Sequence, residues 1–97
     1  MQTEDPVAGS QIRPLLEEKL IDLTIVSEQY HVFEDTTVTV CCLNLINGAK
    51  VIGYNYGSID PTQQNWELGK ATARAMAVEK VWELEGYLLR QRLFSSK

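Results

Sequence analysis

The pair Asn47-Gly48 limits the folds open to this 97-residue chain more than any other feature of the sequence. Asn and Gly accept the positive φ angles that a type I′ turn requires. The runs on either side, TVTVCCLNLI and AKVIGYNY, are rich in β-branched and aromatic residues, which favour strands. The sequence therefore predicts an antiparallel β-hairpin.

A two-residue loop at Asn47-Gly48 also predicts which residues pair across the hairpin. It places Cys42 opposite Gly53, where a glycine would allow close approach by a packed element. One face then collects Thr39, Cys41, Leu43, Leu45, Lys50, Ile52, Tyr54 and Tyr56, and the other Val38, Val40, Cys42, Asn44, Ile46, Ala49, Val51 and Gly53. Because both faces are largely apolar, we expect helices to cover one and another subunit to cover the other.

Helical patterns flank the hairpin. Pro14 and an apolar stripe of leucines predict a first helix over residues 14 to 25, and EQYHVF, residues 28 to 33, favours a brief extended segment. Asp60-Pro61 suits the start of the last element. The apolar residues that follow at helical spacing are Leu68, Ala71, Ala75, Val78 and Trp82. Gly86 predicts that this element is one kinked helix or two consecutive helices.

The expected fold is therefore α+β, with an N-terminal helix, a β-hairpin or three-stranded antiparallel sheet, and a long C-terminal helix, kinked or split. Residues 1 to 10 contain Pro6, Gly9 and Ser10 and are expected to form a flexible lead-in. Residues 11 to 97 then form a single domain, as expected for a chain of this length.

Charge is unevenly distributed along the chain. The net charge of −4 disfavours binding to long nucleic acids. Residues 1 to 61 carry 3 Lys/Arg against 9 Asp/Glu, whereas residues 62 to 97 carry 6 against 4, so an anion is expected to bind the C-terminal third. The acidic N-terminus is unlike a signal peptide and no apolar run is long enough to span a bilayer, so we expect a cytoplasmic protein with no membrane partner.

The cysteines and the single histidine do not form a metal-binding pattern. Cys41 and Cys42 are adjacent and would point to opposite faces of a strand, so we expect two reduced, buried thiols. A zinc site needs about four ligands at recognisable spacing, and His31 is the one histidine. The sequence predicts neither a metal nor a cofactor.

Lys70 and Arg74 lie one helical turn apart, where like charges repel weakly. One interpretation is a solvated helix face, or pairing with acids such as Glu67. The alternative is a ligand site in which both cations bind phosphate while Trp66 stacks on a base, with Tyr54 or Tyr56 adding stacking or a hydroxyl.

Gly69, Ala73 and Ala77 form a strip of small residues at four-residue spacing. They either fill a tight core within the chain or make an oligomer contact with a second copy.

Catalytic patterns are missing from the sequence. There is no GxSxG, no GxxxxGK[ST] and no GxGxxG, and Glu83 and Glu85 diverge on a helix. We therefore expect a binding protein and no enzyme. Arg90 and Arg92 suit the negative end of the helix, and whether they bind ligand stays open.

The runs TVTVCCLNLINGAKVIGY and DPTQQNWELGKATARAMAVEKVWELEGYLL resemble a small phage protein family named after gene products forty-nine and sixty-six of two enterobacterial phages. The resemblance covers roughly residues 36 to 93. It implies a self-associating α+β domain, a dimer or a larger assembly such as a hexamer. Ala49 replaces the family's usual Phe, Trp66 stands where Phe is common, and Tyr56 is an addition.

The chain is also similar to the Thoeris anti-defence protein one group. This resemblance implies a phage sponge in the host bacterial cytoplasm that binds a cyclic ADP-ribose isomer or a cyclic oligonucleotide, signals of Thoeris and CBASS defence, without degrading it. Lys70 and Arg74 match the basic residues of that group. The alternative function is a phage accessory module that binds another protein and takes no small ligand.

Overall fold

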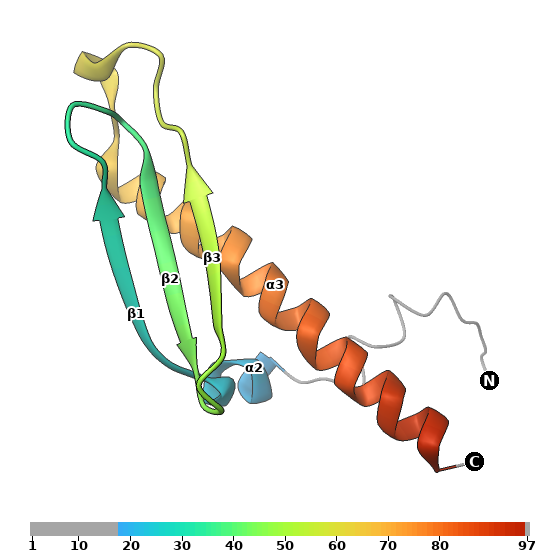
Figure 1. The fold of residues 1–97 in the computed structure, drawn as a ribbon. Coiled ribbons are helices and arrows are strands. Elements are labelled where there is room, and N and C mark those ends of the chain that lie inside the picture. Colours follow the sequence, from blue (N-terminus) through green and yellow to red (C-terminus); the bar gives the residue numbers. More distant parts are fainter. Residues whose placement is uncertain (1–17, 97) are drawn as a thin grey trace.

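The computed structural model describes residues 18–96 as a three-stranded antiparallel sheet crossed by one long helix (Figure 1). The elements in order are α2 (Glu18–Thr24), β1 (Ile25–Val32), β2 (Thr39–Leu45), β3 (Lys50–Asn55), the 3-10 helix η1 (Pro61–Gln63) and α3 (Trp66–Ser95). The strand order is β1-β2-β3. The predicted α+β fold is confirmed, with the three-stranded form of the sheet. The predicted lead-in lies outside the described residues.

The first helix leads directly into the first strand. Within the described residues α2 ends at Thr24, whose hydroxyl donates to the Leu20 carbonyl (2.9 Å), one residue before the predicted end. β1 then begins at Ile25, so the extended segment expected at residues 28 to 33 is longer and is an edge strand paired with β2. Ile21 is buried and attaches α2 to the core.

The hairpin forms, but its predicted register is wrong by one residue. Leu45 N–H donates to the Ala49 carbonyl (2.8 Å), and Gly48 N–H donates to the Leu45 carbonyl (2.9 Å). The loop therefore comprises three residues, 46–48, and Gly48 has a φ of +90°. A turn followed by a left-handed glycine is a common three-residue hairpin loop.

This one-residue shift exchanges the faces of β3 relative to β2, because side chains alternate along a strand. Cys41 pairs with Gly53 and Cys42 with Ile52, in place of the predicted pairing of Cys42 with Gly53. The face beneath α3 comprises Thr39, Cys41, Leu43 and Leu45 together with Val51 and Gly53. Ile52 and Tyr54, predicted to share that face, lie on the other one.

The small residues of α3 are the ones that face the sheet. Ala73 and Ala77 are 0% exposed and Gly69 is also buried, whereas Leu68, predicted to lie on the inner stripe, is 62% exposed. A Cβ atom on Gly53 would overlap the Ala73 carbonyl oxygen and lie 2.5 Å from the Ala77 nitrogen. The close approach predicted at Gly53 is thus confirmed, and small residues on the helix permit it.

The start of α3 differs from the prediction, and one of the two forms expected for this helix is excluded. Asp60 caps the short η1, where its carboxylate accepts from Thr62 N–H (3.0 Å), and the N-cap of α3 is Asn65, whose side-chain oxygen accepts from Leu68 N–H (3.0 Å). The helix runs without a break through Gly86 to Ser95, so it is not split. Its C-terminal turns extend beyond the end of the sheet (Figure 1).

The core lies between the sheet and α3. Its buried residues are Ile21, Cys41, Leu43, Leu45, Val51, Ala73, Ala77 and Val81, and Tyr30 and Trp82 pack against it. Cys41 and Cys42 are free thiols; Cys41 is buried and Cys42 half-buried. Burial raises the pKa of the Cys41 thiol, so this thiol stays protonated at neutral pH and packs as a small apolar side chain.

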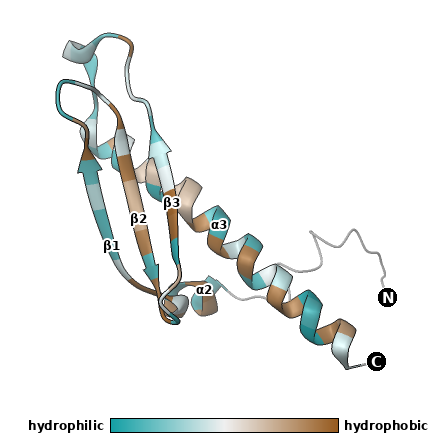
Figure 2. Ribbon diagram, in the orientation of Figure 1, coloured by the Kyte–Doolittle hydropathy of each residue, from teal (hydrophilic) through white to brown (hydrophobic). Residues whose placement is uncertain are grey.

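The opposite face of the sheet carries no helix in the part of the chain that the structure describes (Figure 1). Its side chains include Val40 and Cys42 from β2, both half-buried, and Ile52 and Tyr54 from β3, both exposed. Much of β2 and part of β3 are brown in Figure 2, because these strands carry apolar side chains on both faces of the sheet. We refer to these four residues as the open sheet face.

Candidate functional site

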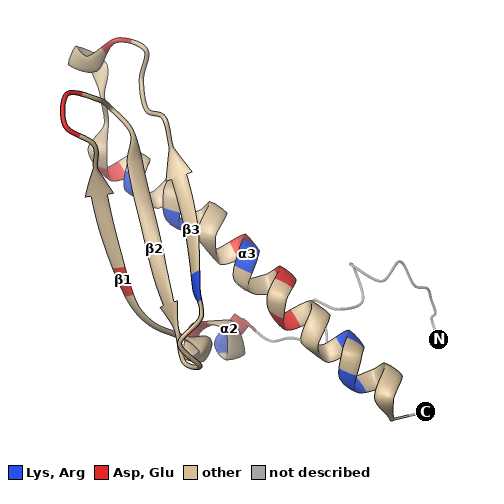
Figure 3. Ribbon diagram, in the orientation of Figure 1, with Lys and Arg blue, Asp and Glu red and all other residues tan. Residues whose placement is uncertain are grey.

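Two cations in the N-terminal half of α3, Lys70 and Arg74, contact residues of β1, and Figure 3 shows basic positions along this part of the helix. Arg74 Nε donates to Oε2 of Glu28 at 3.0 Å. Lys70 Nζ lies 5.2 Å from the centre of the Tyr30 ring, within the range of a cation–π contact. Glu28 and Tyr30 both belong to β1, so the two predicted basic residues meet two residues of the edge strand. We call these four residues the basic flank.

Glu28 is the centre of the hydrogen bonding in the basic flank. Its Oε1 accepts from the Tyr30 hydroxyl at 2.6 Å and its Oε2 accepts from Arg74. These two hydrogen bonds, with that from Tyr30 the larger effect, lower the pKa of the Glu28 carboxyl. The bond to Glu28 raises the pKa of Arg74 in turn. Glu28 is therefore ionised at neutral pH and the flank carries a net charge of about +1.

Tyr30 is held in its protonated form. Burial against the core, followed by the hydrogen bond that its hydroxyl donates to Glu28, raises the pKa of Tyr30 well above its usual range. A tyrosine in this state donates a hydrogen bond but does not act as a base. Its ring also supports the ammonium group of Lys70.

Trp66 is the first residue of α3 and lies one turn before Lys70. Residues four apart on a helix share a flank, so Trp66, Lys70 and Arg74 form one row. The Trp66 side chain is 44% exposed, which leaves ring surface for stacking. The structure thus places three of the five predicted ligand-binding residues together.

The other two lie elsewhere. Tyr54 pairs with Val40 on the open sheet face, and its ring lies 5.3 Å from that of Tyr56. The sheet therefore separates both tyrosines from Lys70 and Arg74 of the same chain. The predicted site is not complete within one copy.

The strip of small residues, for which the sequence left an oligomer contact open, is buried within the single chain. Gly69, Ala73 and Ala77 pack against the sheet of their own chain, which agrees with the first of the two interpretations that the sequence left open. A second copy cannot reach them without separating α3 from the sheet.

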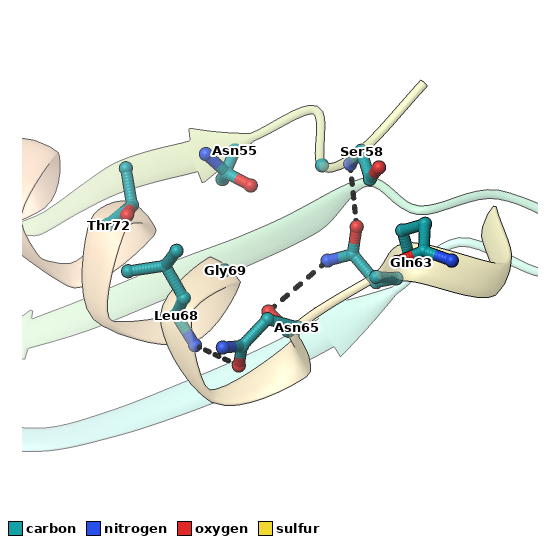
Figure 4. A pocket seen from close by; sticks show the side chains of 9 residues that line it. Asn55, Ser58, Gln63, Asn65, Leu68, Gly69 and Thr72 are labelled. Carbon is teal, nitrogen blue, oxygen red and sulfur yellow. Dashed lines mark hydrogen bonds between the residues drawn. The ribbon is translucent and has the colours of Figure 1, made fainter. Parts of the chain in front are cut away.

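A cavity lies on the flank of α3 opposite the basic flank, beside β3 (Figure 4). It has a volume of about 280 Å³. Four amide side chains, Asn55, Gln63, Gln64 and Asn65, line it together with Leu68 and Gly69, and none of the described lining residues is charged. We call it the amide pocket. The sequence did not indicate this pocket, because the last helix was expected to begin at Asp60-Pro61, which would place the polar run TQQN inside that helix.

Hydrogen bonds order the mouth of the amide pocket. Ser58 N–H donates to the Gln64 side-chain oxygen at 2.6 Å, and Gln64 Nε2 contacts the Asn65 carbonyl at 3.5 Å (Figure 4). Asn65 is at the same time the N-cap of α3. The pocket wall is therefore fixed by the same residues that start the helix.

Glu28 and Tyr30 are the functional candidates that sequence reasoning missed in the basic flank. Their alternation, Glu-Gln-Tyr, places both side chains on one face of a strand, but nothing local shows that this strand lies beside the helix cations. Among residues 18–96 no group of three His, Cys, Asp or Glu side chains is arranged to hold a metal ion. No helix within that range is long and apolar enough to cross a membrane.

One long helix packs through glycine and alanine onto a three-stranded antiparallel sheet, with a basic flank on one side of the helix and an uncharged pocket on the other, and together they define a small α+β domain. The chain belongs to the Phage protein (N4 Gp49/phage Sf6 gene 66) family, whose model matches residues 16–93. The match begins before the hairpin and so extends the resemblance seen at residues 36 to 93. Neither the curated proteins nor the solved structures contain a significant match.

Proposed function

We propose that this phage protein is an anti-defence sponge that sequesters a cyclic nucleotide immune signal, a cyclic ADP-ribose isomer or a cyclic oligonucleotide, without cleaving it. The observation that carries the proposal is the row of Trp66, Lys70 and Arg74 above Tyr30 on an open flank of α3. Two cations suit phosphate and an exposed indole ring suits a base.

Glu28 gives the basic flank a second role in this proposal. In the free chain it neutralises Arg74, so a phosphate must compete with one carboxylate for the guanidinium. A released carboxylate can accept hydrogen bonds from ribose hydroxyls, as acidic residues do in dinucleotide sites. A nucleotide, which carries both groups, then binds better than inorganic phosphate.

The protonation states of the flank support binding without cleavage. The lowered pKa of the Glu28 carboxyl makes it a weak base, and the raised pKa of Tyr30 keeps its hydroxyl protonated. General acid–base catalysis works best with a pKa near the operating pH. Neither group meets that condition, so we propose that the protein is not an enzyme.

Self-association belongs to the same proposal. Tyr54 and Tyr56 lie on the other side of the sheet from Lys70, so they take part in the ligand site only if a second copy supplies them. A homo-oligomer would bring the open sheet face of one copy toward the basic flank of the next. This arrangement accounts for all five predicted ligand residues.

The test is retention and release of intact ligand. The purified protein is incubated with cyclic ADP-ribose isomers and with cyclic di- and trinucleotides, freed of unbound ligand, and heated; the supernatant is then analysed by chromatography and mass spectrometry. We expect one signal class to be recovered unchanged. Failure to retain any of them contradicts the proposal.

A matched pair of double variants locates the site. Lys70→Glu with Arg74→Glu should abolish retention, whereas Arg90→Glu with Arg92→Glu makes the same change in charge near the end of α3, away from the basic flank. Equal loss in both double variants would indicate a general electrostatic effect and would contradict a site at Lys70 and Arg74.

The second candidate is a protein-interaction module without a small ligand. The open sheet face favours it, because Ile52 and Tyr54 are exposed large side chains on a sheet surface that no described element covers. Under this alternative Ile52→Lys abolishes activity against host defence, and the variant of Lys70 and Arg74 keeps it. The sponge proposal predicts that the variant of Lys70 and Arg74 loses that activity.

A further inference from the structure

We propose that the last turns of α3 pair antiparallel with the same segment of a second copy, through a contact separate from the basic flank and from the open sheet face. The segment comprises residues 84–95, and its final turns extend beyond the end of the sheet (Figure 1). It contains none of the five predicted ligand-binding residues, so the inference does not rest on the proposed function.

Large apolar side chains are exposed along one side of this segment. Leu84 and Leu88 are nearly half exposed, and Tyr87 and Phe94 are 69% and 71% exposed. Together with two small polar residues they follow helical spacing. The terminal stripe, as we call it, comprises Leu84, Leu88, Gln91 and Ser95 along its centre, with Tyr87 and Phe94 along one edge. Contiguous apolar surface of this kind is rare on a monomer and marks an interaction site.

Two hollows follow the terminal stripe and form one groove. The first, of about 220 Å³, lies between the hairpin and α3, and we call it the hairpin cleft. Its mostly apolar lining includes Thr24, Leu45 and Ile46 on one side and Leu84, Tyr87 and Leu88 on the other. The second hollow, of about 410 Å³, continues along the stripe past Leu88 to Ser95. Because both hollows include Leu88, another helix can lie along the whole groove.

The charges of the segment indicate which helix that is. Glu85 and Arg92 lie seven residues apart, so they share the edge of the stripe opposite Tyr87 and Phe94. Neither forms an ion pair with another described residue. Acidic positions are followed by basic ones toward the end of α3 (Figure 3). This order is complementary to itself when reversed, which favours an antiparallel second copy.

One antiparallel register satisfies the charged edge, the centre and the aromatic edge at once. It places Leu84 opposite Ser95 of the partner subunit and Leu88 opposite Gln91 of the partner subunit. In antiparallel coiled coils the two edges of such a stripe then face their counterparts. Glu85 therefore meets Arg92 of the partner subunit, and the two-fold symmetry of the pair makes this ion pair twice. Tyr87 meets Phe94 of the partner subunit, also twice.

The same register fills the hairpin cleft. Tyr87 lines the cleft, so Phe94 of the partner subunit lies at its mouth and can insert its ring among the leucines. An aromatic anchor in an apolar pocket, with charged groups at the rim, is typical of interface hot spots. The paired segment is only about 18 Å long, which is small for a stable interface. We therefore expect a micromolar dissociation constant.

The test is sedimentation velocity of the full chain without ligand over a range of concentrations. The parent should dimerise. Glu85→Arg and Arg92→Glu each bring like charges together twice, so each should raise the dissociation constant by at least about tenfold. An equimolar mixture of these two variants restores both ion pairs and should dimerise as the parent does. A parent that stays monomeric up to about 1 mM, or a mixture that does not associate, would overturn the inference.

Two further variants test the register and the anchor. Glu83→Arg makes the same charge reversal outside the stripe and should leave the dissociation constant unchanged. Phe94→Ser removes the anchor and should raise it by at least about thirtyfold. Both positions are exposed, so the Tm of the monomer should equal that of the parent. An equal loss with Glu83→Arg and Glu85→Arg would show that overall charge controls association, and the register would be wrong.

The two double variants used for the proposed function separate it from this inference. Arg90→Glu with Arg92→Glu should lose the dimer and keep the cyclic nucleotide, and Lys70→Glu with Arg74→Glu should do the reverse. A dimer lost only in the variant of Lys70 and Arg74 would place association at the basic flank. This inference would then fail while the proposed function stood.

Discussion

Arg74 Nε lies 3.0 Å from Oε2 of Glu28 and joins α3 to the edge strand β1 across 46 positions of the sequence. Both side chains are 39% exposed, so solvent screens the pair and its contribution to stability is small. The importance of the contact is in placing Arg74: the guanidinium is held above β1, on the same flank as Lys70 and Trp66.

The contact predicts a specific pH dependence. Because the pKa of Glu28 is lowered in the folded chain, its stabilising contribution is present above the ordinary glutamate pKa, about 4.3, and is lost as the pH falls through the lowered value. Urea unfolding should show Glu28→Gln less stable than the parent by under about 1 kcal/mol at pH 7. The difference in the free energy of unfolding between Glu28→Gln and the parent should disappear at acid pH. A difference that grows at acid pH would contradict the assignment.

The contact between Gly53 and α3 predicts a large effect of one methyl group. Gly53→Ala would force the new Cβ against the Ala73 carbonyl and Ala77, so the free energy of unfolding should fall by about 3 kcal/mol or more. Thermal unfolding by circular dichroism measures it.

Gly48→Ala is the matched control for that substitution. Gly48 has a φ of +90° and no atom within 4 Å of an added Cβ, so backbone strain alone should cost about 1 kcal/mol. Equal losses at the two glycines would show that the helix does not lie so close to Gly53.

The cap of α3 predicts a difference between two neighbouring turns. Asn65→Ala removes the acceptor of Leu68 N–H at the start of a 30-residue helix and should cost about 1 kcal/mol. Asp60→Ala affects only η1 and should cost clearly less by chemical denaturation. The reverse order would place the start of the long helix at Pro61, as the sequence alone suggested.

For the hairpin, the sequence was sufficient to predict the pairing of two strands but not their register. Asn47-Gly48 between two β-prone runs was enough to predict two paired strands. It was not enough for the register, since the same dipeptide serves a two-residue loop or a three-residue loop with a left-handed glycine. The Leu45 to Ala49 hydrogen bond decides for the longer loop, and that single residue determines which side chains of β3 enter the core.

The face of α3 that packs on the sheet could not be predicted from the sequence. Leucine and alanine at positions such as Leu68 and Ala75 formed the more apolar stripe, yet Gly69, Ala73 and Ala77 face the sheet. Hydrophobicity favours the first stripe, but backbone approach at Gly53 requires the second. The partner that decides between them lies on another strand, so the choice could not be read from the helix sequence alone.

The candidate site was predicted in part. Lys70, Arg74 and Trp66 share a flank because of helical spacing, which the sequence contains. Glu28 and Tyr30 join them only through packing of α3 across the sheet, and Tyr54 and Tyr56 are separated from them because the register differs from the predicted one. Contacts over long sequence separations were the part that local patterns did not supply.

The distance between α3 and the sheet is short because the residues in contact are the smallest ones, Gly53 on the sheet and Ala73 and Ala77 on the helix. A contact between helix and sheet that is built in this way accepts almost no larger residue, whereas residues on the two flanks of the helix can change without altering it. Proteins with this architecture can therefore diverge in what they recognise on either side of α3 while the shared contact between helix and sheet stays fixed.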